Sequence, residues 1–458
     1  MSKREIKTNH FELIYLDNKF NYDICNDNQV CDKLLIRELY RLNLYNKLKK
    51  KLLDFTTEYV NKYNISVSNS DITTKDEYFN QNIIIEILIM IIMNYDKKDD
   101  PLFTDKSLFN KKIIDKYIKD KCITINKTSM DVIINVLPKI SDFYLDCYDD
   151  FLNMKNKILD IKYDINYEII DNLVNINLNV DNEYITRLGI EEIKYKSSIK
   201  LSLHIFNHLV KLYNTKILND YQSIEIKDKI VIEYIYMVYM RYYIISSGNM
   251  QASILPSFKK LLKDRLNIKI ELFGSALNTS MTNFGSIFYD IEWVFGSFGN
   301  YFNTTIQKGY YEANPPFDIC LIKNMFDKMI IELDKAEDKK LPLLFFIIFP
   351  LSYSKSNKIP DLLQPYIKFD KVFNKNDFTY IRYDRDFTKT NVSSITDTHI
   401  LICHTSYINS IYTSTVQNFA NIMKKWSSNT NPKKSNIIKK DVNKEYNIIN
   451  SYRILKNH

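Results

Sequence analysis

Glycine is scarce in this sequence. Only 7 of its 458 residues are glycine, although glycine makes up about 7% of an average protein. Six of the seven nevertheless lie between Gly248 and Gly309. Because glycine is used where the backbone takes a positive φ or where another atom approaches closely, this interval is predicted to contain demanding backbone geometry. The plainer alternative is a few tight turns within one sheet.

Long apolar stretches and closely spaced cysteines are also missing. The longest nearly apolar run, Ile83 to Met93, includes Glu86 and is too short to span a bilayer. The 6 cysteines are scattered, with no close pair at metal-ligand spacing, so we expect neither a disulfide framework nor a metal site. No basic and then apolar leader is recognisable, so we expect an intracellular protein with no membrane partner.

What the sequence does contain is typical of a globular protein. Hydrophobic residues make up 45% of the chain and charged residues 26%, which excludes general disorder. The formal net charge is +8, and residues 421–458 carry nine Lys or Arg against two acidic residues, a net +7, so the rest is close to neutral. This tail is predicted to be a flexible basic arm, either a nucleic-acid tether or a solubilising extension.

Residues 1–250 are predicted to form a mostly helical domain. Apolar residues recur at helical spacing in several segments, and Pro138 is expected to break one of them. The predicted helices are Asp32 to Asp54, Tyr78 to Tyr95, Met130 to Leu159, Ile199 to Tyr213 and Lys227 to Ile245. Tyr163 to Val180 alternates as a strand does.

Residues 251–420 are predicted to form an α/β domain, because short apolar runs alternate there with amphipathic helices. The expected strands are 268–273, 290–295, 308–312, 343–349, 378–383 and 399–403, and the expected helices are 257–266 and 318–332. Ligands of such sheets bind beyond the carboxyl ends of the strands, where Gly274, Asn314 and Pro350 fall.

The Asn-Pro-Pro-Phe motif at residues 314–317 follows a predicted strand and precedes a predicted helix. The exocyclic amine of adenine is a poor nucleophile, and the carbonyls of Asn314 and Pro315 could accept its two N–H groups and stabilise the charge that grows on nitrogen. The prolines would keep these carbonyls aimed, and Phe317 would stack on the base. The alternative is a structural helix start, with Asn314 as the cap.

Several motifs in one order give the chain a family resemblance over residues 248–426. They are Gly248 to Ala252, Glu271 to Asn278, Phe295 to Gly299, Tyr311 to Phe317, and the strand Phe346 to Pro350. Together they resemble the cap-specific adenosine N6-methyltransferases, also described as phosphorylated-CTD-interacting factor. The resemblance implies a Rossmann-like methyltransferase domain preceded by a helical domain that contacts RNA and cap. It also implies methyl transfer from S-adenosylmethionine to N6 of the first transcribed, 2′-O-methylated adenosine beside the 7-methylguanosine cap of mRNA.

The resemblance also implies roles for individual residues. Asn314 to Phe317 would be the catalytic motif and would touch both cofactor and base. The other cofactor contacts would be Phe273, Gly274, Ser275, Gly296, Asn376, Asp377 and Phe378. The capped RNA would meet Ser352, Tyr353, Arg37 and Arg41, although a solvated helix face is the alternative for the two arginines.

Some features of the family pattern are absent or unassigned. No WW module is recognisable before the core, so binding to the phosphorylated polymerase tail is not implied, and Leu351 to Tyr353 stand where the family tends to carry Trp and Arg. An acidic residue is expected at the cofactor ribose, and Asp290, Glu292 and Glu312 are unranked candidates.

Two other functions remain open at this level. One is the same chemistry on a different adenine, in DNA or internal RNA. The other is a non-catalytic RNA-binding subunit that retains the motif. The bias toward Asn, Ile, Lys and Tyr indicates an AT-rich genome, such as that of a large DNA virus or a protist. The cytoplasm, the nucleus, a viral factory or a virion are the expected locations.

Overall fold

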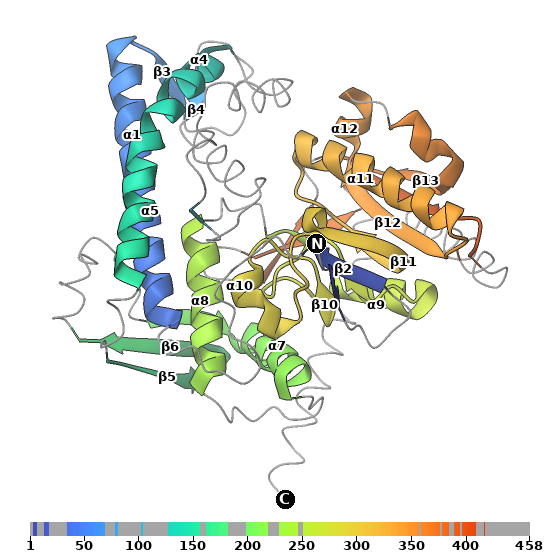
Figure 1. Ribbon diagram of the computed structural model, residues 1–458, viewed down its shortest axis with the longest axis horizontal. Helices are drawn as coiled ribbons and strands as arrows, with labels where there is room; N and C mark the ends of the chain where they lie inside the picture. The colour runs from blue at the N-terminus through green and yellow to red at the C-terminus, as the bar shows by residue number, and fades with distance from the viewer. Residues whose placement is uncertain are drawn as a thin grey trace, which may run out of the picture.

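A helical layer forms one side of the molecule in the computed structural model (Figure 1). The structure describes residues 3–6, 13–17, 34–68, 78–80, 102–103, 127–155, 162–181, 198–218, 229–245, 251–356, 359–375, 378–383, 389–393, 396–408 and 416. Helix α1 (Leu34–Lys62) packs along α5 (Ser141–Lys155), which follows α4 (Lys127–Val136). Pro138 lies in a 3-10 turn, Leu137–Ile140, between α4 and α5, so the predicted break is confirmed.

The first 250 residues also contain β-structure. Strands β5 (Tyr163–Ile170), β6 (Leu173–Val180) and β7 (Ser198–Ser202) form an antiparallel sheet. The segment Tyr163 to Val180, predicted as a strand, is therefore a hairpin of two strands, β5 and β6. The helix predicted from Ile199 begins only at Leu203, because Ser202 caps α7 (Leu203–Tyr213) by accepting the Ile205 N–H.

The helix predicted from Tyr78 is wrong at its start. Strand β4 (Tyr78–Asn80) pairs in parallel with β3 (Ser66–Ser68). Residues 81–95 lie outside the described part of the chain.

A mixed sheet forms the second half of the molecule. Its parallel strands are β10 (Asn283–Phe284), β9 (Ile270–Glu271), β11 (Thr304–Ala313) and β12 (Leu343–Pro350), in that order. Antiparallel β16 (Thr398–His404) and β13 (Ile367–Phe373) follow beyond β12. The predicted α/β architecture after a helical region is thus confirmed at this level.

Two N-terminal strands join the same sheet. Strand β2 (Leu13–Asp17) pairs with the first half of β11 and with β1 (Lys3–Ile6). A smaller antiparallel sheet consists of β15 (Lys389–Ser393), β14 (Thr379–Tyr383) and β8 (Ser253–Ile254). The domain boundary predicted near residue 250 stays a prediction.

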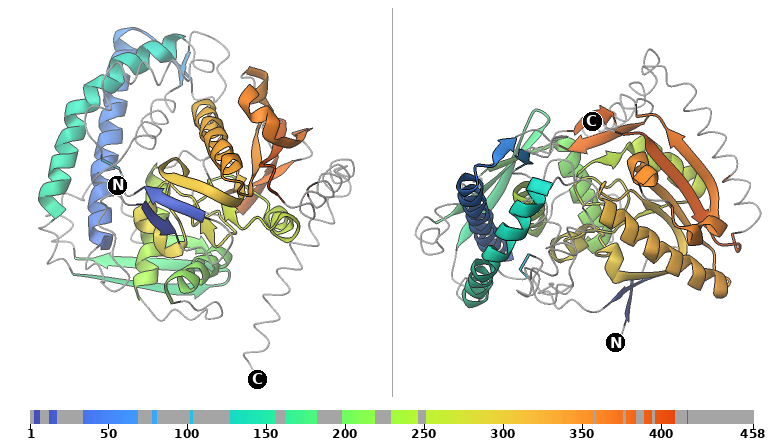
Figure 2. Two further views of the ribbon diagram at one scale, coloured as in Figure 1. Left: turned by 45° about the vertical axis from the view of Figure 1, so that its right-hand side comes forward. Right: turned by 90° about the horizontal axis from the view of Figure 1, so that it is seen from above.

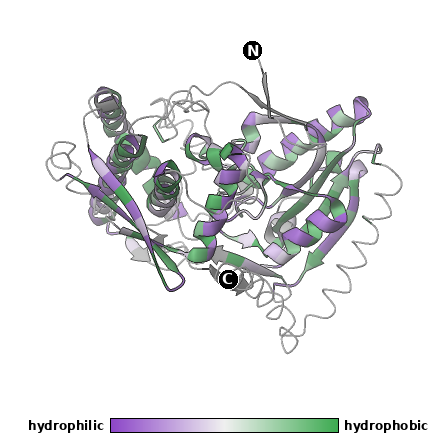
Figure 3. Cartoon of the chain, turned by 90° about the horizontal axis from the view of Figure 1, so that it is seen from below, coloured by the Kyte–Doolittle hydropathy of each residue, from purple (hydrophilic) through white to green (hydrophobic). Residues whose placement is uncertain are grey.

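Helices cover both faces of the main sheet. All side chains of β12 are buried, and they alternate between two apolar layers, as the two faces of a strand require. Phe346 packs in the layer that includes α9 (Pro256–Leu266), whereas Phe345 packs in the layer that includes α11 (Ile319–Asp338). Figure 3 shows hydrophilic and hydrophobic sides on these covering helices.

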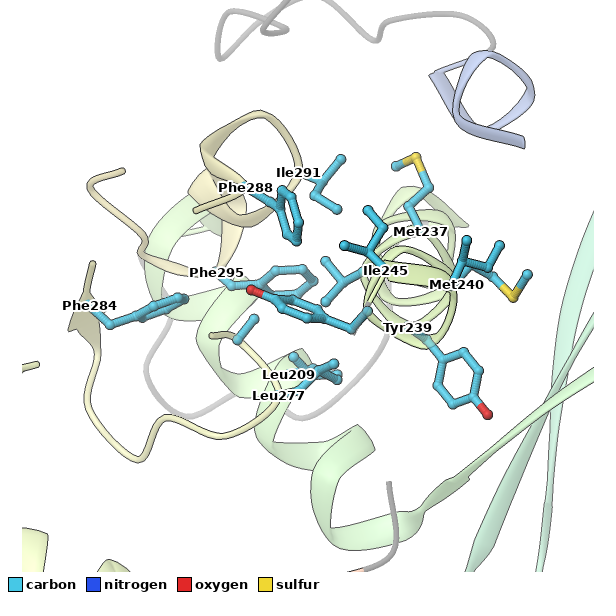
Figure 4. Close-up of a cluster of buried hydrophobic side chains, with 14 of the residues drawn as sticks. Leu209, Met237, Tyr239, Met240, Ile245, Leu277, Phe284, Phe288, Ile291 and Phe295 are labelled. Carbon is cyan, nitrogen blue, oxygen red and sulfur yellow. The ribbon is translucent and has the colours of Figure 1, made fainter. Parts of the chain in front are cut away.

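Helix α8 (Lys229–Ile245) connects the helical layer to the sheet layer, because side chains around most of its surface are buried. Figure 4 shows Met237 and Ile245 of α8 beside Phe288 and Ile291. The strand predicted over Asp290–Phe295 is wrong. These residues form α10 (Tyr289–Glu292) and a 3-10 turn, Trp293–Phe295, whose apolar side chains pack on α7 and α8.

A buried ionic network ties α1, α8 and α10 together. The fully buried Arg241 guanidinium donates to Glu38 and, at 2.6 Å, to Asp290. Arg41 donates to the same Glu38 carboxylate at 2.5 Å. Among the described residues, no helix is long and apolar enough to cross a membrane.

Candidate active site

The strand order places a topological switch point between β9 and β11. The chain passes from β9 outward to β10, and from β11 in the opposite direction to β12. Loops that leave the carboxyl ends of two such strands diverge, and ligands of open α/β sheets bind in the space between them. The two loops here are Leu272–Ser275 and Asn314–Phe317.

Asn314 has a buried acceptor without a partner. Asn314 is 7% exposed, and its Oδ1 accepts no hydrogen bond from any described group. Helix α11 is capped four residues later, since the Asp318 carboxylate accepts the Leu321 N–H at 3.0 Å. The Asp318 N–H donates to the Pro316 carbonyl at 2.7 Å. The alternative role of Asn314 as the helix cap is therefore wrong, and its Oδ1 remains available to a ligand.

Phe317, three residues after Asn314, presents an exposed aromatic ring. Its side chain is 44% exposed. Its ring meets that of the buried Tyr380 from β14 nearly edge-on, with centroids 5.8 Å apart and an interplanar angle of 85°. The contact fixes the ring on one side and leaves aromatic surface exposed to stack on a planar ligand.

Two buried carboxylates lie opposite each other at the switch point. Glu271 of β9 and Glu312 of β11 are register partners. Lys259 of α9 donates to both oxygens of Glu271, at 2.7 Å each, and Thr279 donates to one of them at 2.8 Å. Both Glu312 oxygens lack partners in the described structure. Burial and the Glu271 carboxylate raise the pKa of Glu312 well above its usual range, against the lowering effect of Lys259.

A third buried carboxylate holds the loop after β9. Glu292 accepts the Ala276 N–H at 2.7 Å and the Tyr242 hydroxyl at 3.0 Å. The Ser275 hydroxyl donates to the Gln251 side chain at 2.8 Å. Burial raises the pKa of Glu292 to about 7, and the hydrogen bonds from Ala276, Ser286 and Tyr242 lower it in part. Glu292 therefore positions the loop.

Two glycines permit close backbone packing next to this loop. A Cβ on Gly285 would lie 2.3 Å from the Leu272 carbonyl oxygen. Gly296 has φ of +100°, and a Cβ there would lie 2.1 Å from the Thr282 carbonyl oxygen. The predicted demanding backbone is confirmed at these two positions. A cofactor contact by Gly296 stays a prediction.

A comparison with known families gives the same assignment as the motifs. Residues 208–382 match the family model described as phosphorylated CTD interacting factor 1 WW domain. This part of the chain is similar to that family. The match runs from α7 to β14, so it includes the switch point and the Asn-Pro-Pro-Phe motif. It contains one tryptophan, Trp293, in the turn after α10.

Three further residues that the family resemblance implies as cofactor or RNA contacts, Phe273, Tyr353 and Phe378, are partly or fully buried against aromatic rings. Phe378 is 2% exposed and lies among aromatic rings, including Phe258 and Tyr380. Phe273 is half-buried, with its ring 5.5 Å from that of Tyr301. Tyr353 in α12 (Leu351–Ser356) is 3% exposed and packs on Phe326 and Phe349. Asn376, Asp377 and the Ser352 side chain lie outside the described structure.

The two arginines of α1 lie apart from the switch point. Helix α8 packs between α1 and α10, and Figures 1 and 2 both show α1 on the opposite side of the molecule from α11. Arg41 is 9% exposed, pairs with Glu38 and lies 4.6 Å above the Phe151 ring. The alternative of a solvated helix face is wrong for Arg41. Contact of Arg37 and Arg41 with capped RNA stays a prediction.

The structure also identifies functional candidates that the sequence reasoning missed. Lys259, Glu271 and Tyr380 all lie around Glu312. In the sequence, Glu271 and Glu312 each stand in a predicted strand with an uncharged residue on either side. Their proximity depends on the parallel pairing of β9 with β11, which the sequence does not display.

Proposed function

We propose that this protein is an S-adenosylmethionine-dependent methyltransferase that acts on N6 of the first transcribed, 2′-O-methylated adenosine beside the 7-methylguanosine cap of mRNA. The observation that supports this most strongly is the buried, unpartnered Oδ1 of Asn314 at the switch point. A buried acceptor without a partner costs about 1–3 kcal/mol. Binding of a ligand with an N–H donor removes this cost.

The chemistry of the adenine amine fits such an acceptor. Its nitrogen lone pair is delocalised into the ring, so the amine must be held and polarised before it can attack a methyl group. Asn314 Oδ1 and the Pro315 carbonyl would accept its two N–H groups and stabilise the developing positive charge, an effect worth about 100- to 1,000-fold in rate for one such group. The exposed surface of Phe317 would stack on the base.

The residues near the switch point also suit the cofactor. S-adenosylmethionine supplies an electrophilic methyl group on a positively charged sulfur. The acidic side chain of Glu312 and the loop at Gly274 and Ser275 would bind and orient it, with Glu292 holding that loop in place. The parallel order β10-β9-β11-β12 supports a Rossmann-like assignment, because doubly wound sheets of this kind bind nucleotide cofactors at the switch point.

Capped mRNA is the proposed partner. The matched family is named for interaction with phosphorylated CTD, and cap recognition comes to this chain through the motif resemblance. Residues 421–458, with their excess of Lys and Arg, would add salt-sensitive affinity for RNA. An intracellular site of action, in cytoplasm, nucleus, viral factory or virion, follows from this substrate.

The test is methyl transfer from labelled S-adenosylmethionine to short RNAs. One RNA begins with capped, 2′-O-methylated A, and the controls begin with uncapped A or capped G. Transfer confined to capped A is expected. Transfer to every A-containing RNA would replace the cap assignment by a more general adenine methyltransferase. No transfer and no cofactor binding would indicate a non-catalytic RNA-binding subunit.

Asn314→Ala tests the mechanism. We expect turnover to fall at least about 100-fold with no loss of stability, because Oδ1 has no partner in the described structure. Asn324→Ala, an exposed position on α11, is the matched control and should keep full activity. Full activity in Asn314→Ala would contradict the mechanism.

A further inference from the structure

The buried charges at the switch point do not balance. Glu271, Glu312 and Lys259 are 1%, 0% and 3% exposed, and Lys259 is the one cation within the described part of this cluster. Both contacts of the Lys259 ammonium go to Glu271, which also accepts a hydrogen bond from Thr279. Glu312 is left without a hydrogen bond or ion pair in that cluster. Two buried carboxylates therefore share one positive charge.

Among the described residues, no other group compensates the charge of Glu312. The charged and titratable groups that face it are Glu271 on β9, Lys259 on α9 and Tyr380 on β14. The phenol of Tyr380 interacts with Thr398 at 3.3 Å. Burial and the Glu271 carboxylate raise the pKa of the Glu312 carboxyl, against the lowering effect of Lys259, so burial favours the neutral, protonated form of this carboxyl.

Glu312 also lies beside the acceptor of the proposed site. Side chains of a strand alternate between faces, so Glu312 points to the face opposite Tyr311 and Ala313, and Asn314 follows directly after the end of β11. Tyr311 and Ala313 pack in the layer of α11. The unpartnered Glu312 carboxyl is consequently next to the place where Asn314 would receive the adenine amine and the methyl donor.

We infer that Glu312 is the counter-ion for a positively charged group of the cofactor, and that its carboxyl releases its proton to solvent when the cofactor binds. This inference rests on the proposed function. The cofactor carries two such groups, the sulfonium and the α-ammonium of its amino-acid portion. A bound cation restores the missing charge of the cluster, because two carboxylates then face two cations.

The affinity of the protein for the cofactor should therefore depend on pH. Below the pKa of Glu312 in the free protein, cofactor binding must displace the proton, and the affinity should fall by about tenfold for each pH unit. Above that pKa the affinity should not depend on this group. A neutral ligand of the same shape would not displace the proton.

Isothermal titration calorimetry of the full-length protein measures this directly. S-adenosylmethionine is titrated at one pH in phosphate and in Tris buffer, whose protonation enthalpies differ, so the difference between the observed enthalpies gives the protons released. We expect release approaching one proton per cofactor in the wild-type protein and close to none in Glu312→Gln. Glu332→Gln, a buried glutamate on α11 bonded to Tyr301, is the matched control and should release the same number as wild type.

The product S-adenosylhomocysteine distinguishes the two cations. It has a neutral thioether but keeps the α-ammonium. Smaller proton release with the product assigns Glu312 to the sulfonium, and equal release assigns it to the ammonium. Binding of the cofactor to wild type without proton release would overturn the inference while leaving the proposed function intact. Failure of wild type to bind the cofactor would instead overturn the proposed function. The wild-type measurement needs no variant, so misfolding of Glu312→Gln would not affect it.

Discussion

Lys259 of α9 donates to both carboxylate oxygens of Glu271 inside the protein, at 2.7 Å each. The pair connects a helix that covers the main sheet to the strand that borders the switch point. Removing one partner of a buried ion pair leaves the other charge uncompensated, which is more costly than removing both.

Lys259→Met should therefore destabilise the fold by about 3–5 kcal/mol. It would leave Glu271 and Glu312 together without a cation. Urea denaturation of wild type and variant measures the change. Lys260→Met, the exposed neighbour on the same helix, is the control and should change stability by less than about 0.5 kcal/mol. Equal effects of the two substitutions would show that the ion pair is not important for stability.

Phe317→Ala should weaken substrate binding more than it slows the chemical step. The exposed ring is expected to stack on the base in both ground state and transition state, so its loss should raise KM about 5- to 150-fold and leave kcat nearly unchanged. Phe317→Tyr keeps the ring and should behave as wild type. The measurement is steady-state methyl transfer over a range of RNA concentrations. A drop in kcat at constant KM would be inconsistent with stacking.

Gly285→Ala should destabilise the protein by about 1–3 kcal/mol or more. Its new Cβ would lie 2.3 Å from the Leu272 carbonyl oxygen, so the backbone of one loop must move. Gly274→Ala is the comparison, because the nearest atom to its Cβ, at 3.1 Å, belongs to the Glu271 side chain. Thermal unfolding should show the larger loss for Gly285→Ala. The opposite ranking would contradict the close backbone approach.

The stability of the protein should depend on pH through Glu292. Burial raises its pKa to about 7 in the folded state, whereas an unfolded glutamate titrates near 4.3. The folded state thus keeps the proton to higher pH. The stability contributed by this group is complete below the unfolded pKa and is lost as pH rises toward 7, by up to about 1.4 kcal/mol per pH unit.

Urea denaturation at pH 5 and pH 7.5 measures this dependence. Glu292→Gln cannot ionise but can still accept the Ala276 N–H through its side-chain carbonyl. The stability difference between wild type and this variant should therefore change with pH in the stated direction. A difference that is constant from pH 5 to pH 7.5 would mean that Glu292 does not titrate in this range.

The sequence by itself determined the elements that local pattern controls. The unbroken apolar run Leu343–Phe349 predicted a central strand, and β12 is buried along its whole length. The helical spacing of apolar residues from Asp32 to Asp54 predicted most of α1. The Asn-Pro-Pro-Phe motif indicated the candidate site, because an unusual motif of four residues restricts both backbone shape and chemistry.

Tertiary structure alone decided which charges meet. The sequence left Asp290, Glu292 and Glu312 as equal candidates for a ligand. Packing separated them, since Asp290 pairs with Arg241 and Glu292 bonds to Ala276, while Glu312 stays without a partner in the described structure. Strand pairing brings Glu312 next to Glu271, 41 positions earlier in the chain.

Packing also overrode local pattern where a segment is short. Asp290–Phe295 alternates like a strand, but it pairs with none of the described strands and instead packs as helical turns on α7 and α8. Likewise Arg41, which the helical periodicity allowed on a solvated face, is buried against Glu38 because α5 and α8 cover that face. Propensity over a few residues is worth less free energy than burial against a neighbouring element, so only the assembled fold settles such positions.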